Sequence, residues 1–203
     1  PAGTFFFAVD GDIGVFGQLS FIKDLSGTKV GSNGTITLVT NGQPCAGRNY
    51  SGSTVVPVDT VLGLGQTAET YMLARAPAGT VFAETDDIDL DNNGVIDPKF
   101  RLRKIDAIAY ITQRGATIAY GPVLAAGEVN VPNAATRFPG TTSPLSASAW
   151  YHGELSASPD NATAYRAPLS ANFPAGGMLT PGAPNVSGAP NQVRSQHQRR
   201  RQH

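Results

Sequence analysis

The acidic loop, residues 86–97, is the densest cluster of potential ligands in the sequence and reads Asp-Asp-Ile-Asp-Leu-Asp-Asn-Asn-Gly-Val-Ile-Asp. Carboxylates at this density repel one another unless a cation or solvent screens them. Asp89, Asp91 and Asn93 alternate, and Gly94 follows them. This spacing matches the first half of an EF-hand loop, where side chains at positions 1, 3 and 5 converge on one ion and a glycine makes the sharp turn. The loop is therefore a candidate cation site.

Calcium is the cation that these residues favour, because carboxylate, amide and carbonyl oxygens are hard ligands. Val95 would offer its backbone carbonyl, and Asp97 would bind directly or through water. Phe100 stands at position 12 and has no carboxylate, so a complete EF-hand is excluded. The ligand still missing is expected from Asp86, Asp87 or Glu84, or from a distant loop. The predicted metal ligands are Asp87, Asp89, Asp91, Asn93, Val95 and Asp97.

Two other interpretations of the acidic residues stay open. The acidic loop can be solvated, with its charge balanced by four bases directly after it, Lys99, Arg101, Arg103 and Lys104. Asp10 and Asp12 form a possible second oxygen site, but the pattern Asp-Gly-Asp is more typical of a plain turn.

No catalytic constellation emerges from the sequence. His152 is the only histidine outside the C-terminal tail that could act as a base, and no Gly-x-Ser-x-Gly motif surrounds a serine. No glycine-rich loop followed by a helix is present to bind the phosphate of a cofactor. Trp150 and Tyr151 could stack on a sugar, although such residues more often pin a loop to the core. We predict that the protein is not an enzyme.

The net charge of zero hides a division along the chain. Residues 1–160 hold all 15 acids and ten of the 15 bases, a net charge of −5, whereas residues 161–203 hold no acid and five arginines. Arg199-Arg200-Arg201 near the end could hold an anionic polymer by charge alone or contact the acidic body of a neighbouring subunit. Without interleaved aromatic residues this run predicts no specific nucleic acid partner.

The remaining composition limits the compartment only weakly. Cys45 is the only cysteine, so an intrachain disulfide is impossible. No apolar run approaches the roughly 18 residues of a membrane helix, and we predict no membrane span. The low charged fraction of 15% and the Ser/Thr/Asn-rich surface are more typical of secreted β-proteins.

Short apolar and β-branched runs between turn residues predict an all-β fold. No 3.6-residue apolar period persists over three turns. Lys104–Thr112 and Thr117–Tyr120, joined by a turn at 113–115, are expected to form an antiparallel hairpin. The other predicted strands are Thr4–Val9, Gln18–Leu25, Thr35–Thr40, Thr54–Val56 and Thr70–Arg75.

The C-terminal part of the chain gives fewer signals. Residues 121–185 are rich in Pro, Ala, Ser and Gly, and the segments 136–140 and 148–153 are expected to be loops pinned by aromatic side chains. We predict one domain over residues 1–185 and a basic, flexible tail over residues 186–203.

The order of several short motifs resembles that of bacterial lamin-tail-like domains. The resemblance covers roughly residues 3–185, and its motifs carry little information singly. They are the segments 2–7, 9–12, 24–27, 31–34, 86–94, 105–108, 135–140 and 179–185. The resemblance implies an immunoglobulin-like β-sandwich with long irregular loops on a secreted or cell-surface protein, in a family whose members are mostly non-enzymatic modules.

Domains of this family usually open with an apolar strand and an acidic strand, and both are missing here. Without them, the strand Thr4–Val9 is expected to have an unpaired edge that invites a strand from another chain. We therefore expect an extracellular, calcium-stabilised structural module that forms a homo-oligomer, polymer or filament by strand complementation. A fragment of a longer polypeptide explains the missing strands equally well. The alternative function is an adhesion module that binds a glycan or a cell-surface partner.

Overall fold

The computed structural model describes residues 3–40, 50–59, 68–111, 117–126, 134–155, 165–166, 180 and 182–185. These residues form strands and loops, with two short 3-10 turns as their helical elements, so the predicted all-β fold is confirmed. The elements are β1 (Thr4–Asp10), β2 (Leu19–Asp24), β3 (Ile36–Thr40), β4 (Thr54–Val58), β5 (Glu69–Arg75), η1 (Pro98–Phe100), β6 (Arg103–Ile111), β7 (Val123–Ala126), β8 (Ala134–Arg137), η2 (Ala147–Ala149), β9 (Trp150–Leu155) and β10 (Tyr165–Arg166).

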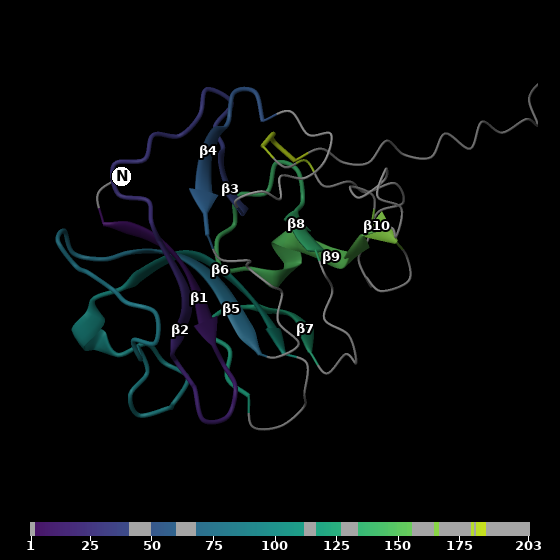
Figure 1. Ribbon diagram of the computed structural model, residues 1–203. Coiled ribbons are helices and arrows are strands. Elements are labelled where there is room, and N and C mark those ends of the chain that lie inside the picture. Colours follow the sequence, from purple (N-terminus) through teal and green to yellow (C-terminus); the bar gives the residue numbers. More distant parts are fainter. Residues whose placement is uncertain are drawn as a thin grey trace, which may run out of the picture.

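A five-stranded sheet with the order β2-β1-β5-β6-β7 forms the base of the molecule (Figure 1). β1 pairs antiparallel with β2 on one side and with β5 on the other. The prediction of an unpaired edge on Thr4–Val9 is therefore wrong. That strand is internal, because β2 and β5 supply both of its neighbours.

Both faces of this sheet are apolar, as the sequence of β1 requires. Successive side chains of a strand point to opposite faces, so Phe5, Phe7 and Val9 share one face while Phe6 and Ala8 share the other. A run of consecutive apolar residues is typical of a strand that is covered on both sides.

Loops cover the face of Phe5, Phe7 and Val9. The ring of Phe82 makes edge-on contacts with Phe5 and Phe7, at centroid distances of 5.3 and 5.1 Å. Phe100 and Ile118 also pack on this cluster. Residues 81–102, which include η1, lie beside the sheet at the left of Figure 1. The acidic loop is part of this cover.

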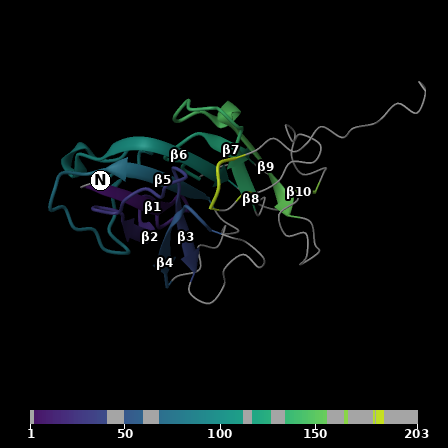
Figure 2. The ribbon, with the colours of Figure 1, turned by 90° about the horizontal axis from the view of Figure 1, so that it is seen from above.

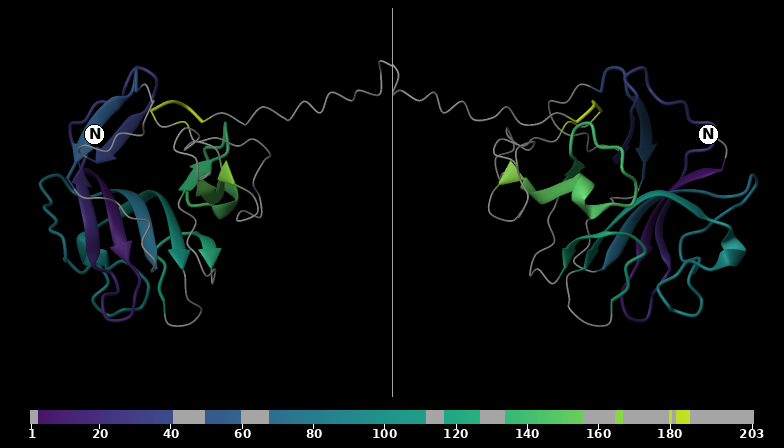
Figure 3. Two further views of the ribbon diagram at one scale, coloured as in Figure 1. Left: turned by 45° about the vertical axis from the view of Figure 1, so that its right-hand side comes forward. Right: turned by 180° about the vertical axis from the view of Figure 1, so that it is seen from behind.

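The other face of the sheet meets a second layer that consists of two separate pieces. β3 and β4 form a parallel pair, and β8, β9 and β10 form an antiparallel group. Figure 2 shows β3 and β4 beneath β1 and β2, and Figure 3 shows the group of β8, β9 and β10 (green) apart from β3 and β4 (blue). Leu38 of β3 and Ala135 of β8 both contact the apolar cluster on this face.

The C-terminal half of the chain corrects several expectations. Residues 117–120 do not return as a strand; β7 follows them and pairs parallel with β6. The N–H of Ile118 donates to the carbonyl of Gly11 instead, and the N–H of Tyr120 to the hydroxyl of Thr70. The expected loops 136–140 and 148–153 contain parts of β8 and β9, which pair with each other.

Residues 182–185 are held by two hydrogen bonds to parts of the chain that are far away in the sequence. The side-chain amide of Asn33 donates to the carbonyl of Gly182 (2.6 Å), and that of Asn185 donates to the carbonyl of Arg137 (2.9 Å). Cys45 and the basic tail, residues 186–203, lie outside the described residues. Among the described residues, no helix has the length and apolar character that would cross a membrane.

Candidate functional site

Asp89 is the centre of the acidic loop, and its side chain is fully buried, with 0% exposure. Its Oδ1 accepts the N–H of Asn93 (3.1 Å), and its Oδ2 accepts the N–H of Gly94 (2.9 Å) and the hydroxyl of Tyr120 (2.8 Å). A buried carboxylate without partners would be costly, so these donors make the burial possible. Asp89 therefore fixes the loop to the core.

The other side chains of the loop also accept hydrogen bonds from the loop itself. Asp87 accepts the N–H of Asp89 (2.8 Å), and Asp97 accepts the N–H of Leu90 (3.0 Å). Asn93 links to the carboxylate of Asp91 through its amide and accepts the N–H of Val95 (2.7 Å). The loop thus holds its shape by hydrogen bonds within the chain.

The electrostatics of Asp89 follow from these contacts. Burial alone would raise its pKa, but the hydroxyl of Tyr120 and the N–H groups of Gly94 and Asn93 stabilise the carboxylate and lower the pKa below its usual value. Burial and the hydrogen bond to Asp89 raise the pKa of Tyr120, so its hydroxyl stays protonated as the donor.

The donor chemistry of the loop suits calcium, because every predicted ligand offers oxygen. Asp87, Asp89 and Asp97 each accept at least one backbone N–H of the loop. The described residues contain no group of three or more His, Cys, Asp or Glu side chains arranged to hold a metal ion. Phe100, at position 12, packs on the core. Calcium binding by Asp87, Asp89, Asp91, Asn93, Val95 and Asp97 therefore stays a prediction.

Asp10 and Asp12 act as turn residues. Oδ1 of Asp10 accepts the N–H of Asp12 (2.8 Å), and Oδ1 of Asp12 accepts the N–H of Ala68 (3.0 Å). Burial raises the pKa of Asp10. This geometry favours the plain turn over a second cation site.

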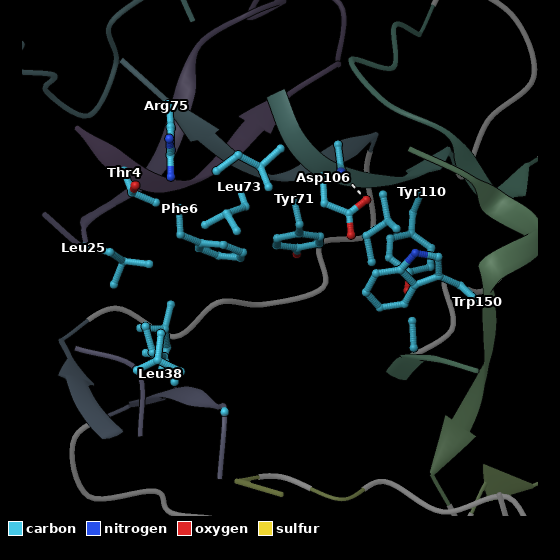
Figure 4. Close-up of a pocket in the computed structure, with 17 residues that line it drawn as sticks. Thr4, Phe6, Leu25, Leu38, Tyr71, Leu73, Arg75, Asp106, Tyr110 and Trp150 are labelled. Carbon is cyan, nitrogen blue, oxygen red and sulfur yellow. Dashed lines mark hydrogen bonds between the residues drawn. The ribbon is translucent and has the colours of Figure 1, made fainter. Parts of the chain in front are cut away.

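An apolar hollow of about 720 Å³ lies between the five-stranded sheet and the two pieces of the second layer. Figure 4 shows Phe6, Leu73 and Tyr71 along the sheet side, with Leu38 of β3 opposite them. The size of this hollow is within the usual range of ligand pockets, roughly 300–1,000 Å³.

Two buried hydroxyls that line the hollow lack a partner. Thr4 is 4% exposed and Tyr110 is 2% exposed, and neither hydroxyl has a hydrogen-bond partner among the described residues. They lie at opposite ends of the hollow in Figure 4, and Arg75 is close to Thr4. An unpaired buried polar group costs about 1–3 kcal/mol, so both positions call for a group that the described residues do not supply.

An ion pair holds the hairpin of β8 and β9 to the sheet beside the hollow. The guanidinium of Arg137 bonds to the carboxylate of Asp106, which also accepts the N–H of Leu145 (2.9 Å). The guanidinium lies over the ring of Trp150, 4.7 Å from its centroid. One face of this tryptophan is therefore covered by Arg137, and Tyr151 beside it is buried.

His152 lies in β9 and is buried, so the prediction that segment 148–153 is a loop is wrong at this residue. Sequence reasoning also missed Tyr120, Thr4, Tyr110 and Arg75 as functional candidates. Their spacing in the sequence does not identify them, because Tyr120 bonds to a distant residue and the other three line a hollow that forms only in the folded chain. The one available signal was their position in strand-like runs, which predicts burial without saying what lies opposite.

Comparisons with models of protein families, with curated proteins and with solved structures found no match. The resemblance to lamin-tail-like domains therefore stays a prediction that rests on the motifs of the sequence.

Proposed function

We propose that the chain is a non-catalytic extracellular structural module, an immunoglobulin-like sandwich of the lamin-tail-like type, that assembles into a polymer by strand complementation. One observation carries this proposal. β3 pairs with β4 on one side, no described strand pairs with its other edge, and its side chains Ile36 and Leu38 line the apolar hollow. The acceptor is therefore β3, in place of the strand Thr4–Val9 that the sequence suggested.

The composition of β3 suits an acceptor edge. Ile36-Thr37-Leu38-Val39-Thr40 contains no charge, whereas protected edges commonly carry lysine or proline. Ile36 and Leu38 line the hollow. A strand added beside β3 would direct alternate side chains into the same space.

The energetics make assembly dependent on concentration. Three inward apolar side chains would contribute about 5–9 kcal/mol when fully buried. Association costs about 4–15 kcal/mol in lost freedom of motion, so backbone hydrogen bonds along β3 must supply the surplus. Because donor and acceptor are different surfaces of one subunit, the contact does not close on itself and propagates into a filament.

The proposal is tested by light scattering after size exclusion, and by negative-stain microscopy, of the native chain over a range of concentrations. Val39→Lys adds a charge beside the open edge of β3 and should reduce the polymer fraction. The matched control is Val55→Lys on β4, because Val55 is already 46% exposed and β4 has β3 at its side. A clean monomer at all concentrations, or equal effects of the two variants, would refute strand complementation at β3.

Calcium and salt separate the remaining parts of the proposal. We propose that calcium binds the acidic loop and stabilises the subunit, without forming part of the contact between subunits. If the basic tail instead holds an acidic neighbour, salt well above physiological strength should dissolve the polymer, because exposed charges are screened beyond about 8 Å. A contact made by β3 should survive that salt. A monomer that binds on a glycan array would favour the adhesion alternative.

A further inference from the structure

We propose that the apolar hollow of the unassembled chain binds a long-chain carboxylate, of the fatty-acid type, with its head group at Thr4 and Arg75 and its alkyl chain directed towards Tyr110. The inference shares the hollow with the proposed function but does not depend on it, because a ligand can fill this space in a chain that never assembles.

The two ends of the hollow differ from its middle. Thr4 and Tyr110 present buried hydroxyls without partners among the described residues. The described lining between them is mostly apolar and aromatic, including Phe6, Leu73 and Tyr71 (Figure 4). The carboxylate of Asp106, which also lies there, is bonded to Arg137. Polar groups at both ends of an apolar lining match an elongated amphiphile better than a compact molecule, whose polar atoms would meet the apolar middle.

The length of the hollow follows from the strand register. Arg75 pairs with Thr4 at one end of β5, and Glu69 pairs with Tyr110 at the other end. These six residue steps span about 20 Å at roughly 3.4 Å per residue. One acyl chain spans about 15 Å, half of the 30 Å hydrocarbon core of a bilayer. An acyl chain and its head group therefore fit along the strands.

Charge selects the head group. Among the described residues that line the hollow, Arg75 and Asp106 are the charged ones. Asp106 is bonded to Arg137, whereas the guanidinium of Arg75 has no hydrogen bond or ion pair with the described residues. The hydroxyl of Thr4 can donate beside that guanidinium. A carboxylate would accept from both groups, and charge-assisted bonds of this kind are the stronger ones. A cationic head group at this end would be repelled by Arg75 and by Arg103, which pairs with Arg75 in the sheet.

The binding test uses hexadecanoate and the monomer fraction of the full chain. Trp150 is the only tryptophan and lines the hollow, so its fluorescence reports occupation; isothermal titration gives the stoichiometry. We expect saturable binding of one molecule per chain. Hexadecyltrimethylammonium, which has the same alkyl length and a cationic head, should bind at least tenfold more weakly.

Three variants test the assignment of each end. Arg75→Gln should weaken hexadecanoate binding about tenfold, the equivalent of one charge-assisted bond. Arg101→Gln removes the same charge from an exposed turn after η1, away from the hollow, and should leave binding unchanged. A 16-hydroxylated chain should bind more tightly than hexadecanoate, and Tyr110→Phe should abolish that advantage.

Lack of saturable binding, equal binding by Arg75→Gln and wild type, or equal binding of the cationic amphiphile would each overturn the inference. Polymer formation is measured on the same preparations. Polymer without ligand binding would refute this inference alone, and ligand binding by a chain that never polymerises would refute the proposed function alone.

Discussion

Replacing Tyr120 by phenylalanine should destabilise the protein by about 1.5–3 kcal/mol. The variant removes the hydroxyl that donates to the buried carboxylate of Asp89 (2.8 Å) and leaves the ring in the core. Hydrogen bonds to charged groups contribute about 1.5–3 kcal/mol. For a chain of this length, 1 kcal/mol lowers the melting temperature by about 2–4 °C, so a decrease of about 3–12 °C is expected. Urea unfolding measures the free energy directly.

Tyr110→Phe is the matched control for this prediction. It deletes the same atom from an equally buried ring, but the hydroxyl of Tyr110 has no partner among the described residues. Removal of an unsatisfied buried group costs little and can increase stability. If Tyr110→Phe destabilised the isolated chain as much as Tyr120→Phe, the account of the Asp89 network would be wrong.

The same pair of variants gives a pH signature. The pKa of Asp89 is lower in the folded chain than in the unfolded chain, where it is about 3.9. Its contribution to stability is therefore complete above the unfolded pKa and is lost as the pH falls through the folded pKa. Without the hydroxyl of Tyr120 the folded pKa rises, so Tyr120→Phe should lose less stability on acidification than wild type or Tyr110→Phe.

Three further predictions concern the acidic loop and the hairpin of β8 and β9. Gly17→Ala should lower the free energy of unfolding in urea by more than about 2 kcal/mol, because the backbone φ is +74° and a Cβ would lie 2.7 Å from the Cβ of Asp89. The control is Gly14→Ala, where φ is +91° and no atom lies within 4 Å. This variant should cost only the roughly 1–2 kcal/mol of left-handed strain. Calcium should raise the melting temperature, while the chelated protein stays folded because the loop is held by its own hydrogen bonds; equal melting temperatures with calcium and chelator would count against the calcium site. Arg137→Gln should destabilise by about 1–2 kcal/mol, since the pair with Asp106 is only partly buried, and no change in urea unfolding would mean that the hairpin is held by packing alone.

Local sequence patterns were sufficient for the N-terminal strands. β1, β2, β3, β5 and β6 begin and end within one or two residues of their predicted limits, because each is a run of β-branched or aromatic residues between turn residues. The expected hairpin after β6 failed for a different reason. Residues 117–120 have strand-forming side chains, but their backbone donors go to Gly11 and Thr70. Such non-local partners leave no periodic signal.

The acidic loop was found from its composition, but the role of its residues was not. The spacing of Asp89, Asp91 and Asn93 predicts side chains that converge on an ion. The fold turns the oxygens of Asp89 towards Asn93, Gly94 and Tyr120. Tyr120 comes from 31 residues further along the chain, so only the tertiary structure could identify it as the donor.

The buried polar groups of the acidic loop and those of the hollow differ in one respect. The carboxylate of Asp89 has hydrogen-bond donors, whereas the hydroxyls of Thr4 and Tyr110 have no partner among the described residues. Asp89 is buried at a location where the chain supplies three donors, so the acidic loop is stable without a further group. The hydroxyls of Thr4 and Tyr110 are buried at locations where the described chain supplies none, and each costs about 1–3 kcal/mol in the isolated subunit. Valine and phenylalanine would fill the same space without that cost. A bound molecule or strand that paired these hydroxyls would remove that cost, which favours the hollow over the acidic loop as the site of the binding that we propose.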